Sequence, residues 1–151
     1  MAWSMKTVLQ LIRFYPPYLT AGISVCNYNK DITSITVQMN MRPWNKNYVG
    51  THFGGSLYSM CDPWYMFILI HYFGSDYIIW DKSAQINFVS PGKGTVRATF
   101  SISKQQFQDI QMQVQDNQKY FPVFETKIID AQEKTIAYVT KELYIRKKRI
   151  I

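Results

Sequence analysis

One short segment concentrates the residues that could do chemistry. Positions 47–55 read Asn-Tyr-Val-Gly-Thr-His-Phe-Gly-Gly and lead into an apolar stretch. Gly54 and Gly55 stand at a plausible helix start, where two glycines let a ligand approach the backbone closely. The unpaired N–H groups of a first helical turn point outward at the positive end of the helix dipole. They could stabilise the oxyanion that forms when a carbonyl carbon is attacked.

Asp62 is the second candidate, eight residues after Gly54 in a stretch that is otherwise apolar. A carboxylate among apolar side chains is costly unless it is paired, so Asp62 is predicted to have a partner or a purpose. A hydrogen bond from Trp44 or Trp80 would make it purely structural. In a continuous helix Gly54 and Asp62 would lie about 12 Å apart. They could hardly act on one carbonyl together, so the catalytic interpretation predicts a dimer with the site at its interface.

The elements around these residues follow from hydrophobic periodicity. Residues 4–15 are predicted to form an N-terminal helix that ends at Pro16 and Pro17. Residues 56–73 are apolar on nearly every side, which predicts a helix that other elements wrap around. Pro63 within it predicts either a kink or a position close enough to the helix start to be tolerated.

Most of the other segments are predicted to be strands, because apolar and polar residues alternate along several of them. The expected strands are 23–28, 35–41, 77–89, 96–102, 120–130 and 135–146, while 105–116 fits either a helix or a strand. Helices do not alternate with the later strands, which excludes a parallel α/β fold. The sequence therefore predicts an α+β domain over 1–151, with an antiparallel sheet of five or six strands around one apolar helix.

Composition limits the function classes. The 151 residues suit one domain, and 47% hydrophobic with 18% charged residues excludes a disordered chain. The net charge of +7 attracts phosphate-bearing ligands, but no nucleic-acid-binding motif occurs, so we expect no nucleic-acid partner. No signal peptide and no apolar run of roughly 20 residues is found, which predicts a cytoplasmic protein without a membrane span. Cys26 and Cys61 lack metal-ligand spacing, so reduced thiols are expected and no metal.

The segment resembles the signature of hotdog-fold thioesterases of the phenylacetyl-CoA type. It is closest to an uncharacterised branch of that superfamily, a domain of unknown function. The signature residues that match in type and spacing are Asn47, Gly50, Gly54, Gly55 and Asp62. The run Trp80-Asp81-Lys82-Ser83-Ala84, followed by Phe88, Pro91, Gly92 and Gly94, also resembles that branch.

The resemblance implies a site. The N–H of Gly54 or Gly55 would polarise the thioester carbonyl, and Asp62 of the partner subunit would activate water or attack directly. Asn47 would orient the carbonyl or the water. The chain departs from the family pattern at one place: Phe53 stands where the family usually has histidine, and His52 precedes it. The further residues expected to contact substrate are His52, Phe53, Ser56, Tyr58, Trp64 and Arg97.

The implied substrate is an acyl-CoA or an acyl group on a carrier, bound by a homodimer or a dimer of dimers without a cofactor. Tyr58, Met60, Trp64, Tyr65 and Phe67 would surround the acyl chain, and Arg97 could contact phosphates. Two other readings stay open. One is a non-catalytic protein that binds acyl thioesters or lipids, which the displaced His52 favours. The other is a dehydratase. The motif of hotdog dehydratases begins with His-Phe, as at His52-Phe53, but the prolines of that motif are absent from this segment.

Overall fold

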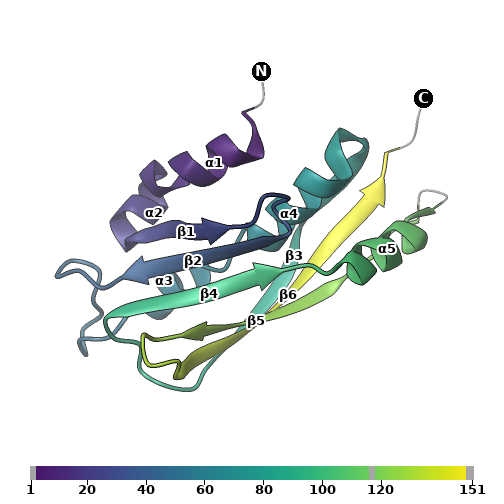
Figure 1. Ribbon diagram of the computed structural model, residues 1–151. Coiled ribbons are helices and arrows are strands. Elements are labelled where there is room, and N and C mark those ends of the chain that lie inside the picture. Colours follow the sequence, from purple (N-terminus) through teal and green to yellow (C-terminus); the bar gives the residue numbers. More distant parts are fainter. Residues whose placement is uncertain (1–2, 116–117, 149–151) are drawn as a thin grey trace.

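A computed structural model describes residues 3–115 and 118–148, and in these ranges six antiparallel strands form one sheet (Figure 1). The strand order is β1-β2-β4-β5-β6-β3. The strands are β1 Ile23–Tyr28, β2 Ser34–Asn40, β3 Tyr77–Phe88, β4 Thr95–Ser101, β5 Val123–Ile129 and β6 Thr135–Lys147. The α-helices are α1 Met5–Leu11, α2 Pro16–Ala21, α3 Gly54–Ser59, α4 Trp64–Phe73 and α5 Lys104–Gln113, with 3-10 turns Ile12–Phe14 and Gly74–Asp76. The predicted α+β class and antiparallel sheet are confirmed.

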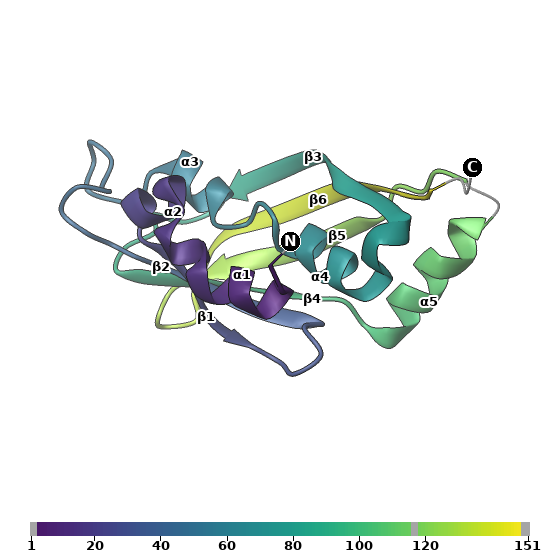
Figure 2. The same cartoon turned by 90° about the horizontal axis from the view of Figure 1, so that it is seen from above.

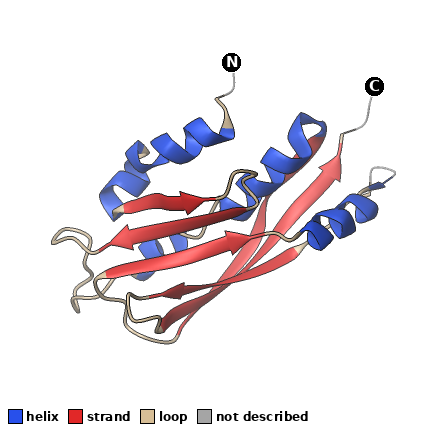
Figure 3. Ribbon diagram, viewed as in Figure 1, coloured by secondary structure: helices blue, strands red, loops and turns tan. Residues whose placement is uncertain are grey.

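The sheet curls around α4. Seen from above, β1 and β2 lie on one side of α4 and β3 and β6 on the other (Figure 2). The helices α1 and α2 lie beside β1, and α5 lies at the far end of the sheet (Figure 3). The buried side chains of α4 are Trp64, Tyr65, Ile68 and Leu69. Because buried residues recur at every second position of β2, β4 and β6, each of these three strands presents one apolar face to the core.

The apolar stretch 56–73 does not form one helix. The helix α3 ends at Ser59, the chain turns, and α4 begins at Trp64 directly after Pro63. At that place the proline costs no helical hydrogen bond, so of the two alternatives for Pro63, a kink or a position near a helix start, the structure shows the second. Asp62 therefore lies in the turn between two short helices. The separation of about 12 Å that a continuous helix would give does not apply.

Two other local predictions are refined. The helix α1 has Ser4 as its N-cap, whose Oγ accepts from the N–H of Thr7, but Pro16 also begins a second helix, α2. The ambiguous segment 105–116 is helical from Lys104 to Gln113, and position 116 lies outside the described residues. No helix within the described ranges is long and apolar enough to cross a membrane.

The two cysteines differ in surroundings, which predicts different reactivity. Cys26 is exposed on β1, whereas Cys61 is buried in the turn between α3 and α4. Burial raises the pKa of the Cys61 thiol to about 12, so almost no thiolate forms near neutral pH. We expect a disulfide reagent such as Ellman's reagent to modify one thiol quickly in the folded protein and two after denaturation. Cys26→Ser should remove the fast reaction, and two fast thiols in the folded protein would contradict the burial of Cys61.

Candidate functional site

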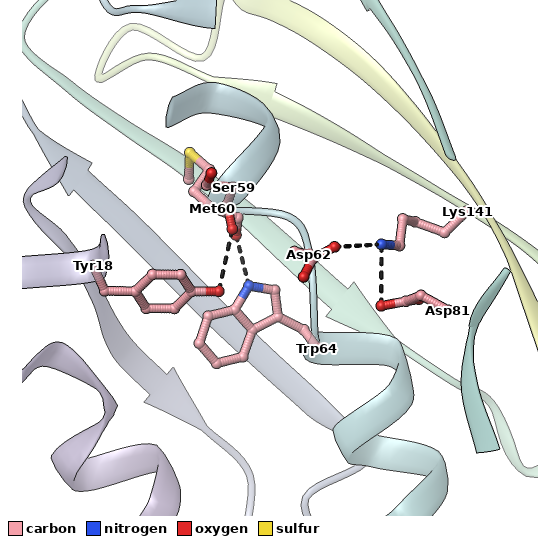
Figure 4. A network of polar contacts seen from close by, with 7 residues as sticks. All are labelled: Tyr18, Ser59, Met60, Asp62, Trp64, Asp81 and Lys141. Carbon is pink, nitrogen blue, oxygen red and sulfur yellow. Dashed lines mark hydrogen bonds and ion pairs between the residues drawn. The ribbon is translucent and has the colours of Figure 1, made fainter. Parts of the chain in front are cut away.

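A buried lysine and two carboxylates form a cluster of charged side chains (Figure 4). Lys141 lies on β6 with a side chain that is 0% exposed. Its Nζ lies 3.1 Å from Oδ1 of Asp62 and 3.2 Å from Oδ2 of Asp81. Asp62 comes from the turn between the helices and Asp81 from β3, so three segments distant in sequence meet at one ammonium group.

The strand pattern explains how a lysine reaches this place. On β6 the inward positions, all 0% exposed, are Ala137, Val139, Lys141, Leu143 and Ile145. Asp81 pairs with Leu143 on the neighbouring strand, two residues from Lys141 and on the same face. On the outer face Lys82 binds Glu142 at 2.9 Å. The alternation of β6, with one lysine at an apolar position, is a sequence signal that would have identified Lys141.

The charges in this cluster depend on one another. Burial alone would lower the pKa of Lys141, but Asp81 and Asp62 raise it above its ordinary value, so the lysine stays charged. Burial raises the pKa of Asp81, and Lys141 opposes that rise. The Asp62 side chain is 52% exposed. The partner of Asp62 is therefore Lys141, whereas Trp44 and Trp80, the structural partners considered above, are exposed and make no described bond to it.

Two side-chain hydrogen bonds support the turn that carries Asp62. The Tyr18 hydroxyl of α2 donates to the carbonyl of Ser59 at 3.1 Å, and the Trp64 indole donates to the carbonyl of Met60 at 2.6 Å (Figure 4). Trp64 is 0% exposed and packs between Tyr18 and Phe100, so its side chain supports the turn from within the core. The expectation that Trp64 contacts substrate is therefore not supported by its packing, because no face of the indole is free.

The glycine pair begins α3 with free donors. The N–H groups of Ser56 and Leu57 both donate to the Phe53 carbonyl at 3.0 Å, while those of Gly54 and Gly55 have no partner among the described residues. Because α3 has only six residues, its dipole adds little, and any anion contact depends on these N–H groups themselves.

Both glycines are closely covered by aromatic rings. A Cβ on Gly55 would lie 2.5 Å from the Phe53 ring, and one on Gly54 would lie 3.1 Å from the Phe88 ring. Side chains at these two positions would therefore displace the rings. Phe53, in the place where the family usually has histidine, thus covers the backbone of Gly55.

The loop 47–52 uses its polar side chains internally. The amide of Asn47 donates to the Thr51 hydroxyl at 2.8 Å and to the His52 carbonyl at 3.3 Å. Its oxygen accepts from the Thr51 N–H at 2.9 Å. Asn47 therefore shapes the loop that leads to the glycine pair. In this conformation its amide donors are used within the loop, so only remaining lone pairs of its oxygen are free for the expected role of orienting a carbonyl or water.

His52 joins that loop to the turn before β4. Its N–H donates to Gly92 and its Nε2 donates to the Gly94 carbonyl at 2.8 Å, which leaves Nδ1 buried and without a partner among the described residues. His52 is 3% exposed, so its imidazole serves the loop and does not face open solvent. Desolvation lowers the pKa of His52, which keeps the ring neutral.

This shift predicts a pH dependence of folding. In the unfolded chain His52 is protonated near its ordinary pKa of 6.5, whereas in the folded chain its protonation requires a lower pH. The free energy of unfolding therefore decreases as the pH falls through 6.5. His52→Gln cannot titrate, and its urea stability should fall less than that of wild type between about pH 7.5 and about pH 5.5. His71→Gln, at an exposed histidine of α4, should keep the wild-type slope. Equal slopes in wild type and His52→Gln would contradict the buried neutral ring.

Two open cavities flank the glycine pair. One, of about 490 Å³, is lined by Phe53, Gly55 and Ser56 together with Trp44 and Lys46. The other, of about 450 Å³, is lined by Asn47, His52, Gly54, Phe88 and others. Asp62 lines neither cavity. Within one chain the structure therefore brings Phe53, Ser56 and the glycines together but leaves the Asp62 carboxylate outside that group.

The two remaining predicted contact residues lie apart. Tyr58 is half-buried on α3, and the Nζ of Lys141 lies 5.6 Å from the centre of its ring, so it borders the Asp62 cluster. Arg97 is exposed on β4, between the buried Val96 and Ala98, on the face of the sheet away from α4. The structure does not bring Arg97 to the glycine pair. The described residues contain no group of three His, Cys, Asp or Glu side chains arranged to hold a metal ion.

Comparisons with known proteins agree with this fold. The model of DUF4442, a domain of unknown function, matches residues 4–145. A protein of unknown function from Pseudomonas aeruginosa, named a probable thioesterase, superposes with a TM-score of 0.85 at 15% identity over 98% of this chain and 99% of that one. The PaaI protein of the phenylacetic acid degradation operon of E. coli gives a TM-score of 0.63 at 18% identity, over 98% and 97%.

A hypothetical thioesterase from Streptococcus pneumoniae, solved with coenzyme A, gives a TM-score of 0.63 at 14% identity, over 93% of this chain and 99% of that one. No curated protein matches the sequence at a significant level. The similarities extend over almost the whole chain and show the hotdog fold, as the sequence predicted.

Proposed function

The chain belongs to the DUF4442 family of domains of unknown function, and from that premise we propose that it hydrolyses acyl thioesters of coenzyme A or of an acyl carrier. The observation that carries the proposal is Asp62, a half-exposed carboxylate whose position is fixed by a buried lysine. The names of the structural neighbours support the same class, because four of them are called thioesterases, three of these with a qualifier such as probable or hypothetical, and one of the four was solved with coenzyme A.

The chemistry needs a base and an oxyanion site. Asp62 accepts a proton from water while the water oxygen bonds to the thioester carbon, and the carbonyl oxygen takes up negative charge. A free N–H of Gly54 or Gly55 donates to that oxygen. The carbon–sulfur bond then breaks, and the thiolate leaves with a proton from the Asp62 carboxyl group. Direct attack by the carboxylate, through an anhydride that water opens, gives the same products.

The glycine pair and Asp62 are most readily combined across a dimer. The strand β3 is an edge of the sheet, twelve residues long, with Trp80 and Phe88 exposed along it. A long edge with unpaired backbone groups is a template for pairing with another strand. Asp81, which shares Lys141 with Asp62, lies on this same strand, so a subunit docked on β3 would approach Asp62.

Strand geometry favours a shared site. Gly54 lies against Phe88 at one end of β3, and Asp81 lies seven residues away, or about 23 Å along the strand. If β3 pairs with its copy about its midpoint, Phe88 of the partner faces Tyr77. That position is four residues from Asp81, or about 13 Å. The partner's Phe88, and with it the partner's glycine pair, would then lie nearer to Asp81 along the edge than the chain's own Phe88 does.

The test is thiol release from a panel of short, long and aromatic acyl-CoA thioesters, with the oligomeric mass measured by sedimentation. We expect turnover of at least one substrate by a dimer or a dimer of dimers. Gly54→Pro and Gly55→Pro each remove one N–H that makes no helical bond. Gly54→Ala and Gly55→Ala are the matched controls, because they place the same Cβ against the Phe88 or Phe53 ring but keep the N–H. The proline variant that loses about 100-fold or more in kcat relative to its alanine control identifies the oxyanion donor. Retention of full activity by both proline variants would contradict this oxyanion site.

A non-catalytic acyl-binding protein is the second candidate. The observation that favours it is the internal use of Asn47 and His52, which leaves few polar groups free beside the glycine pair. Binding of acyl-CoA without thiol release, by a folded dimer, would establish this function instead. A cytoplasmic location and the absence of a nucleic-acid partner stay predictions.

A further inference from the structure

The two oxygens of Asp62 are in different surroundings. Oδ1 lies 3.1 Å from the Nζ of Lys141, while Oδ2 makes no described hydrogen bond or ion pair. We infer that Lys141, anchored by Asp81, is a positioning residue that fixes Oδ1 and presents Oδ2 to the substrate. This inference rests on the proposed hydrolysis, because it assigns to Lys141 the orientation of the reacting carboxylate.

Lys141 is suited to act as a fixed anchor. Its stem is enclosed among the apolar inward side chains of β6, and its ammonium group has no exposed surface. Asp81 holds the same Nζ from the neighbouring strand at 3.2 Å. A surface lysine would lose this geometry to side-chain motion, whereas a buried lysine held between two strands cannot swing away.

The neighbouring groups leave Lys141 as the cation of the cluster. From α2, Tyr18 faces Asp62, and burial raises its pKa well above the ordinary value, so it stays neutral. Cys61 beside Asp62 is neutral too, because burial raises its pKa to about 12. From α3, the Tyr58 ring lies under the ammonium group. Two carboxylates thus share one described cation, and removal of Lys141 would leave them to repel each other.

Three variants separate positioning from folding. Lys141→Met keeps a stem of similar length without the charge, but it leaves the part-buried Asp81 without its cation. The double variant Lys141→Met with Asp81→Asn removes both members of the anchor and so keeps the buried charge balanced. Lys82→Met is the matched control, because it removes a lysine from the equivalent pair with Glu142 on the outer face of the same two strands.

We expect the double variant to fold and dimerise like wild type but to lose about 100-fold in kcat with little change in KM, because Asp62 is no longer held. Lys82→Met should keep the wild-type kcat and KM. Wild-type kcat in the double variant would overturn the inference.

The same experiment distinguishes this failure from failure of the proposed function. If wild type hydrolyses thioesters and the double variant does so equally well, only the role of Lys141 is wrong. If wild type hydrolyses no thioester, the proposed function is wrong and the inference falls with it.

Discussion

We expect Asp62→Asn to lower kcat for thioester hydrolysis by about 1,000-fold and to leave the fold intact. The amide keeps the size of the carboxylate but can neither take a proton from water nor attack a carbonyl carbon. KM should change little, because the carboxylate acts on the reacting atoms and Asp62 lines neither cavity beside the glycine pair. Steady-state thiol release at saturating substrate measures the effect.

A matched control makes this result specific. Asp31→Asn changes an exposed aspartate in the turn between β1 and β2 and should retain wild-type kcat. Both variants should elute and sediment as wild type does. Hydrolysis by Asp62→Asn at the rate of Asp31→Asn would exclude Asp62 as base or nucleophile and make its pair with Lys141 structural.

Lys141→Met should have the largest effect on stability. It leaves Asp81, which is 22% exposed, without its cation, and an unpaired buried charge costs several kcal/mol. Because Asp62 is half exposed and can be hydrated, we expect a loss of about 3 kcal/mol at neutral pH, the low end for broken buried pairs. Urea unfolding at constant m-value measures the loss.

The sign of the pH dependence identifies the cause. Burial already raises the pKa of Asp81, and without Lys141 nothing opposes that rise. A carboxyl group whose pKa is higher in the folded state is stabilised by protonation, so Lys141→Met should recover stability as the pH falls. Adding Asp81→Asn should recover much of it at neutral pH, while Lys82→Met should cost less than about 1 kcal/mol. A deficit of Lys141→Met that is independent of pH and of Asp81 would point to packing.

The sheet was predictable because its strands alternate. The pattern of Val96, Ala98 and Phe100 on β4 identifies both the strand and its buried face. The same alternation places Arg97 on the opposite face of the sheet. This position argues against the expected contact between Arg97 and the phosphates of a substrate bound at the glycine pair. Period-two patterns thus indicate on which face of the sheet each side chain lies.

The break between α3 and α4 could not be predicted from periodicity. Because nearly every residue from Leu57 to Phe73 is apolar, the stretch lacks a polar face that would reveal where one helix stops. Tertiary bonds from Tyr18 and Trp64 hold the turn instead. For α5 the apolar spacing was ambiguous, but the capping box formed by Ser103 and Gln106 was present in the sequence and favours the helix.

The candidate site was only partly visible in the sequence. Asp62 was noticeable as a carboxylate among apolar residues, and its need for a partner followed from the cost of burying charge. The partner itself, Lys141, is 79 residues away, and its pairing depends on the register of β6 and on the position of the turn. Local patterns do not contain that information.

Subunit complementation tests the central claim most directly, that Asp62 of one subunit acts with the glycine N–H of its partner. Asp62→Asn is mixed with whichever of Gly54→Pro and Gly55→Pro is inactive, under conditions that exchange subunits, and thiol release is measured. A shared site predicts that two inactive proteins regain about a quarter of wild-type activity, because half of the dimers are mixed and each has one intact site. If mixed dimers form and no activity returns, the shared site is contradicted.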